Sequence, residues 1–120
     1  MNAMTKIYGI PNCDTVKKAR QWLADNGVAY EFVDFKKTPP TEALIVSWLQ
    51  DVPLTTLLNK RGTAWRKLSD EQKSAADADE AAAVWLMAAQ PSLIKRPVLD
   101  KNGRFYAGFQ TASYESVFKK

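Results

Sequence analysis

The 120-residue sequence contains no histidine and only one cysteine, Cys13. A single cysteine cannot form a disulfide within the chain, and without histidine a catalytic Cys–His pair is impossible. A zinc site, which needs several cysteine or histidine ligands, is not expected either. Any cysteine chemistry must therefore depend on one thiol, activated by backbone dipoles, hydroxyl groups or cationic side chains.

Long hydrophobic runs are absent as well, because no apolar stretch approaches the roughly 20 residues that a membrane-spanning helix needs. The residues from Met1 to Lys6 lack the apolar segment of a signal peptide, and Met4 is a second candidate for the natural start. A lone cysteine fits a reducing compartment. We therefore expect a cytoplasmic protein that does not enter a membrane.

Charge of one sign is only slightly in excess. The chain has 17 lysines and arginines against 13 aspartates and glutamates, for a net charge of +4, and 46% of its residues are hydrophobic. This length and composition suffice for one domain with one core. The basic clusters are short, so direct nucleic-acid binding is not expected, whereas the small positive excess favours binding of small anions.

Cys13 lies where a predicted strand gives way to a predicted helix. The residues of 5–9 favour a strand, Pro11 stops it, and Asn12 and Asp14 suit an N-cap and a first helical turn. A cysteine at a helix N-terminus meets unpaired backbone N–H groups and the positive end of the helix dipole, which favour the thiolate. The alternative is that Cys13 is a small buried hydrophobic side chain, as many single cysteines are.

The hydrophobic periodicity changes twice along the chain. It predicts a strand–helix–strand unit with parallel strands, then a helical middle, then a hairpin with its turn at residues 100–103, where Asn-Gly is a strong turn signal. The expected elements are strands at 5–9 and 30–35, helices at 13–26, 41–50, 54–58, 63–68, from 69 onward and at 79–90, hairpin strands at 97–99 and 104–109, and a last helix from Thr111 or Ser113.

This order of elements, β-α-β, then helices, then β-β-α, resembles a thioredoxin-like α/β fold with an all-helical insertion at about residues 38–92. The chain shows no repeat and no linker, so we expect one domain over residues 1–120. Thioredoxin-like proteins place their reactive cysteine at the start of the first helix, where this chain has Cys13.

Three segments together resemble the arsenate reductase-like (ArsC) family, and within it most closely the YffB-type branch. They are residues 8–20 around the cysteine, residues 57–61 (Leu-Leu-Asn-Lys-Arg) and residues 95–97 (Lys-Arg-Pro). The resemblance implies a nucleophilic thiol at Cys13 and an anion-binding guanidinium at Arg96. It also implies that Pro97 is cis and lies beside the cysteine. Without the resemblance, Arg96 would be a surface arginine next to a strand.

The chain departs from the family's arsenate reductases at several positions. Where those enzymes carry a histidine before the cysteine and a serine after it, this chain has Gly9 and Val16. Of their three oxyanion-binding arginines only Arg96 is matched. Val16 also removes the Cys-x-x-Cys switch of the related Spx regulators, which bind RNA polymerase. Arsenate reduction and a Spx-like regulator are therefore the two alternatives to the main hypothesis.

The main hypothesis is a glutathione-dependent thiol reductase. Because Cys13 is alone, a second thiol must come from outside, and glutathione, or another small anionic thiol, is the expected donor and partner. No bound cofactor or metal is expected, and a protein partner is an open alternative. Thr15 either bonds the sulfur or caps the helix, and Lys17 either binds a carboxylate or is solvated. The remaining residues expected to shape the site or to bind anions are Asn12, Asp14, Arg61, Arg96 and Pro97.

Overall fold

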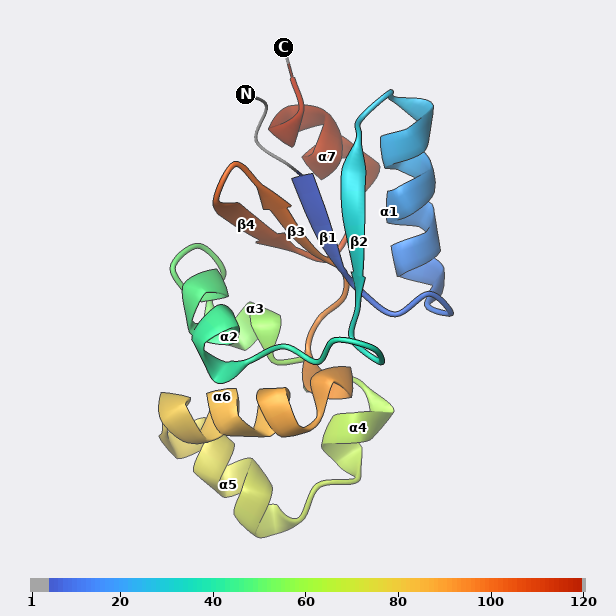
Figure 1. The fold of residues 1–120 in the computed structure, drawn as a ribbon. Helices are drawn as coiled ribbons and strands as arrows, with labels where there is room; N and C mark the ends of the chain where they lie inside the picture. Colours follow the sequence, from blue (N-terminus) through green and yellow to red (C-terminus); the bar gives the residue numbers. More distant parts are fainter. Residues whose placement is uncertain (1–4, 120) are drawn as a thin grey trace. The chain divides into compact units, whose positions relative to one another are not determined.

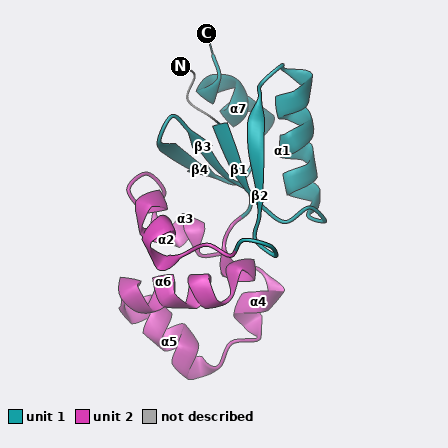
Figure 2. Cartoon of the chain, in the orientation of Figure 1, with its two compact units in different colours: residues 1–38, 96–120 teal, residues 39–95 magenta. Residues whose placement is uncertain are grey.

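The computed structural model describes residues 5–119, so the question of the start at Met4 lies outside the described residues. The chain divides into two compact units, residues 1–38 with 96–120 and residues 39–95 (Figure 2). In the described residues the first unit holds the β-sheet, and the second consists of helices and a single bridge between Leu58 and Ile94. The expected domain organisation, one domain with a helical insertion, stays a prediction.

The sheet of the first unit has four strands, which are β1 (Thr5–Gly9), β2 (Tyr30–Asp34), β3 (Val98–Lys101) and β4 (Arg104–Ala107). Their order across the sheet is β2-β1-β3-β4 (Figure 1). The pairing of β1 with β2 is parallel, as the sequence predicts, and the pairs β1–β3 and β3–β4 are antiparallel. The predicted hairpin turn is confirmed at Asn102 and Gly103, both of which have a positive φ.

Two helices, α1 (Asp14–Asp25) and α7 (Thr111–Val117), cover one face of this sheet. Ile7 and Leu99 from the two central strands form a buried cluster with Tyr114 of α7 and two side chains of α1. Burying an aliphatic side chain of this size contributes about 1.5–3 kcal/mol, so the cluster holds strands and helices together. The resulting β-α-β and β-β-α arrangement is the predicted thioredoxin-like α/β fold.

The second unit is built from short helices, which are α2 (Glu42–Trp48), α3 (Leu54–Leu57), α4 (Thr63–Arg66), α5 (Asp70–Ala78) and α6 (Glu80–Ala89), with a 3-10 turn at Pro91–Leu93. Side-chain caps begin α2 and α5: the Thr41 hydroxyl accepts the N–H of Leu44 at 3.1 Å, and Ser69 forms a capping box with Gln72. Helix α6 packs against both α2 and α5. Within residues 5–119 no helix has the length and apolar character needed to cross a bilayer.

The first helix begins one residue later than the sequence predicts. Cys13 is its N-cap, with φ −102° and ψ 126°, and the helix starts at Asp14. Pro11 and Asn12 are both used in a turn, so the extended residue that leads into the helix is Cys13, and Asn12 is not the cap. The carbonyl of Cys13 already accepts the N–H of Lys17 at 2.9 Å, which joins this residue to the first helical turn.

Three strand ends in the hairpin also differ from the prediction. The third strand is predicted to end at Leu99 and the turn to begin at Asp100, but β3 runs on to Lys101, because Asp100 and Lys101 still pair with β4. The sequence predicts a third strand from Pro97, but β3 begins at Val98, because proline has no N–H to contribute to a ladder. The fourth strand is predicted to reach Phe109, but it ends at Ala107, because Gly108 takes a φ of +81°. The N–H of Gly108 instead donates to the carbonyl of Pro97 at 2.8 Å and closes this end of the hairpin.

Tyr114 brings a polar group into the core of the first unit. Its ring meets the rings of Phe109 and Trp22 edge-on, with centroids 4.7 and 5.6 Å apart. Its hydroxyl is buried and has no hydrogen-bond partner among the described residues. Burial raises the pKa of the Tyr114 phenol well above its ordinary value. The ring therefore stabilises the core, whereas the hydroxyl costs free energy.

We expect Tyr114→Phe to leave the free energy of unfolding at pH 7 unchanged or to raise it by up to about 1 kcal/mol, because the variant loses only a buried, unbonded hydroxyl. Above about pH 10 the unfolded chain ionises this tyrosine while the folded protein keeps it neutral. Wild-type stability therefore falls as pH rises beyond about 10, and the variant lacks this contribution. Urea unfolding at neutral and alkaline pH measures both effects.

The matched control is Tyr114→Leu, which also loses the ring contacts and is expected to destabilise the protein at both pH values. A loss of more than about 1 kcal/mol at pH 7 in Tyr114→Phe would show that the hydroxyl is bonded after all.

Candidate functional site

Cys13 follows the carboxyl end of β1, which is a central strand of the sheet (Figure 1). In the antiparallel pair of β1 and β3, Tyr8 lies opposite Val98. The residues that follow β1 and those that precede β3 therefore meet at the same end of the sheet. This topology brings the turn of Cys13 and the segment of Arg96 and Pro97 to one end of the strands, which we call the sheet edge. More than eighty positions separate the two segments in the sequence.

Two further segments reach the same edge and are tied to it by backbone hydrogen bonds. The N–H of Phe35, directly after β2, donates to the carbonyl of Gly9 at 2.8 Å. At the other side, the bond from Gly108 to Pro97 holds the end of β4 against the start of β3. The edge is thus formed by four segments of the first unit whose backbones are fixed relative to the strands.

The thiol of Cys13 is free and partly exposed. It makes no capping hydrogen bond, although it occupies the N-cap position, where the first backbone N–H groups of α1 have no partner within the helix. Asn12 and Asp14 on either side are exposed, and the Thr15 hydroxyl forms no hydrogen bond in the part of the chain that the structure describes. An accessible and unbonded sulfur at this place is available as a nucleophile.

Arg96 carries an unpaired positive charge at the same edge. Its side chain is partly buried, and the peptide bond to the buried Pro97 is cis. Within residues 5–119 its guanidinium has neither an acidic partner nor a hydrogen bond. A guanidinium offers five N–H donors in a planar fork that fits carboxylates and other oxyanions. The donors of Arg96 are therefore open to an anion from outside the chain.

Three exposed lysines surround this edge. Lys17 lies in the first half of α1, and Lys36 and Lys37 lie in the turn that follows β2. The Asp34 carboxylate accepts the backbone N–H of Lys36 at 2.9 Å and so shapes that turn. Lys36 and Lys37 are not among the site residues predicted from the sequence. The signal was present, because residues that directly follow a strand parallel to the first must reach the same edge.

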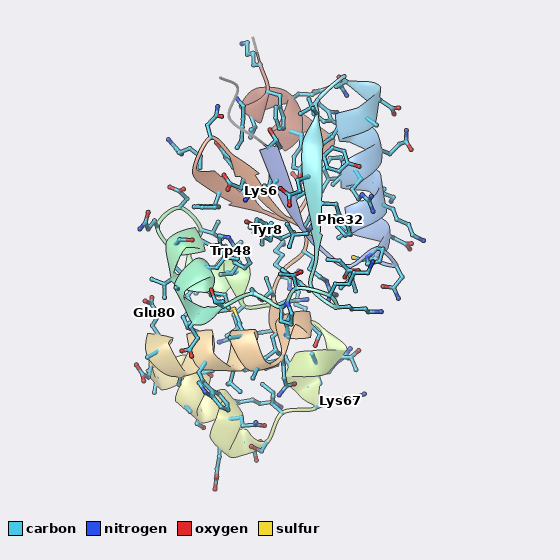
Figure 3. All side chains as sticks on the ribbon, in the orientation of Figure 1. Lys6, Tyr8, Phe32, Trp48, Lys67 and Glu80 are labelled. Atoms are coloured by element: carbon cyan, nitrogen blue, oxygen red, sulfur yellow. The ribbon has the colours of Figure 1, made fainter. Side chains whose placement is uncertain are left out.

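Tyr8 lies next to this edge but on the opposite face of the sheet from the core cluster, since it alternates with Ile7. Figure 3 labels it together with Phe32, which packs against that cluster. Burial raises the pKa of the Tyr8 phenol, and the nearby charges of Asp100 and Glu31 raise it further. Tyr8 therefore stays neutral at pH 7.

Arg61 belongs to the second unit. Its side chain is exposed, and its backbone N–H donates to the Asn59 side chain at 3.1 Å. The neighbouring Lys60 forms an ion pair with Asp77 and lies over the ring of Trp65, 5.2 Å from the centroid. The expected contact of Arg61 with a substrate carboxylate stays a prediction.

Known proteins are similar to this chain over nearly its whole length. The model of the ArsC family matches residues 8–117. An uncharacterized protein of Haemophilus influenzae is 36% identical over 119 residues, which span 96% of this chain and 99% of that protein. The global transcriptional regulator Spx of Streptococcus agalactiae is 28% identical over 111 residues, which span 88% of this chain and 77% of the regulator.

Solved structures are similar over their full length. The structure of a protein named YFFB is 46% identical, with a TM-score of 0.89, and the match covers 94% of this chain and 97% of that one. An arsenate reductase (ArsC) related protein from Brucella melitensis is 45% identical, with a TM-score of 0.73, over 100% and 98% of the two chains. The family match, the shared fold and the cysteine turn lead to one conclusion: the chain belongs to the ArsC family.

Proposed function

We propose that this protein is a glutathione-dependent thiol reductase of the cytoplasm, with Cys13 as its nucleophile. The observation that carries the proposal is the shared sheet edge of an accessible thiol and the unpaired guanidinium of Arg96. A lone thiol can start disulfide exchange but cannot resolve the product, so the donor must be a separate thiol. Glutathione is abundant in reducing compartments and carries carboxylates that cations at this edge can bind.

The proposed reaction has two exchange steps. The Cys13 thiolate attacks one sulfur of a substrate disulfide, the S–S bond of the substrate breaks, and the departing thiolate takes a proton from water. The thiolate of glutathione then attacks the mixed disulfide at the substrate sulfur and releases Cys13 as a thiolate. One substrate thiol and one glutathione-containing disulfide leave, so sulfur oxidation is conserved across the cycle and no metal or bound cofactor is consumed.

The charges at the edge give the site its preference for anionic thiols. Arg96 is partly buried, so its bond to a carboxylate is less screened by water than that of a fully exposed side chain. Lys17, Lys36 and Lys37 are exposed and contribute mainly to the attraction of anions over longer distances. In this assignment Arg96 orients the substrate, and the lysines raise the rate of encounter.

We expect Cys13→Ser to lose glutathione-dependent reduction of a small disulfide completely, because a serine hydroxyl does not perform thiol–disulfide exchange. Turnover is measured as NADPH oxidation coupled through glutathione reductase, with hydroxyethyl disulfide as substrate. The wild-type protein should also give a mass increase of one glutathione after treatment with glutathione disulfide, and excess glutathione should remove it. Full turnover in the serine variant would contradict the proposal.

We expect Arg96→Ala to slow the reaction of Cys13 with an anionic aromatic disulfide, dithiobis-nitrobenzoate, by about tenfold, which corresponds to about 1.4 kcal/mol for one charge-assisted bond. The reaction with the neutral dithiodipyridine should change much less. Lys95→Ala is the matched control, since it removes an adjacent, exposed charge. Equal slowing of both reagents, or an equal effect of the control, would show that Arg96 does not bind the anion.

The two alternative functions predict other outcomes in the same variants. The similarity to an arsenate reductase-related structure supports arsenate reduction, which predicts thiol consumption that arsenate stimulates and Arg96→Ala abolishes. The similarity to Spx supports a regulator, which predicts binding to RNA polymerase that persists in Cys13→Ser.

A further inference from the structure

The first turn of α1 lies close to the end of β1, where the Val16 side chain fills the space that a side chain on Gly9 would need. A Cβ atom placed on Gly9 would lie 2.8 Å from Cγ2 of Val16 and 3.5 Å from Cγ1. Ordinary carbon–carbon contacts are about 3.5–4.0 Å, so no side chain fits at position 9 unless the helix moves. The φ of Gly9 is not in the left-handed region, and the glycine is therefore required by space rather than by backbone conformation.

Neither Gly9 nor Val16 can move easily to make room for a side chain at position 9. Gly9 is the last residue of β1, paired with Asp34 of β2, and its carbonyl accepts the N–H of Phe35. Val16 is fully buried, and a valine in a helix has essentially one allowed χ1 rotamer. A group added at position 9 must therefore be accommodated by a shift of the first turn of α1.

We infer that Val16 and Gly9 are the positioning residues for the thiol of Cys13. Cys13 lies three residues before Val16, and the hydrogen bond from Lys17 to the Cys13 carbonyl closes the turn that joins them. A shift of Val16 consequently carries Cys13 with it, whereas Arg96 is held by the other central strand. The contact thus sets the spacing between the sulfur and the anion-binding guanidinium, an inference that rests on the proposed function.

The test uses Gly9→Ala and measures the reaction of Cys13 with the anionic and the neutral aromatic disulfide across pH. We expect the rate with the anionic reagent to fall by about tenfold, as for a small misplacement of a reacting group, and the ratio of the two rates to change with it. The double variant Gly9→Ala/Val16→Ala should recover the wild-type ratio to within about twofold, because removing the valine methyl groups makes room for the new Cβ.

The matched control is Leu23→Ala, which destabilises the same helix from a buried position in its last turn and should leave both rates unchanged. The inference is overturned if Gly9→Ala reacts like the wild type, or if the double variant fails to recover. Should Gly9→Ala not fold, Val16→Ala alone, which loosens the contact from the other side, must change the ratio of rates while Leu23→Ala does not.

These reactions are stoichiometric and need no turnover, so they separate this inference from the proposed function. If the wild-type protein has no glutathione-dependent turnover, the proposed function is wrong. The effect of Gly9→Ala on the rate with the anionic reagent would still decide whether the contact positions the thiol.

Discussion

The antiparallel pairing of β1 with β3 is the constraint on which the rest of the first unit depends. It places residues 6–8 beside residues 98–100. A strand from the N-terminal part of the chain and one from the C-terminal part are thus joined in the middle of the sheet. The core cluster, the parallel partner β2 and the hairpin partner β4 are all built outward from this pair. The edge that carries the thiol exists only because the two strands run in opposite directions.

In the proposed function, a chain without histidine arranges a cysteine for chemistry. The polar contributions come from a helix terminus and from a guanidinium without a partner in the described residues, rather than from a neighbouring base. The geometric contribution is apolar, since a buried valine presses against a glycine at the end of a strand. Under the proposed function, these polar groups act on the sulfur of Cys13, and the packing of Val16 against Gly9 fixes where the sulfur lies.

The sequence predicts most helices and strands, but few of the contacts between residues that are far apart in the chain. The Asn-Gly turn and the helix starts near residues 41 and 69 are local signals, and the structure confirms them. The start of α1 was misplaced by one residue, because a proline turn and an N-cap compete for Asn12. The meeting of Cys13 with the Arg96 segment came from the family resemblance. The packing of Val16 against Gly9 depends on the distance and angle between α1 and β1, which the hydrophobic periodicity of the sequence does not specify.

The long segment of chain between β1 and β3 determines when the sheet can form during synthesis. Cys13 leaves the ribosome early, but β3, the antiparallel partner of β1, and Arg96 before it follow only after roughly 80 further residues. At elongation rates of about 5–20 residues per second, the nascent thiol spends on the order of 4–16 s without its folded surroundings. The sheet edge on which the thiol lies is therefore complete only when the last quarter of the chain has been made.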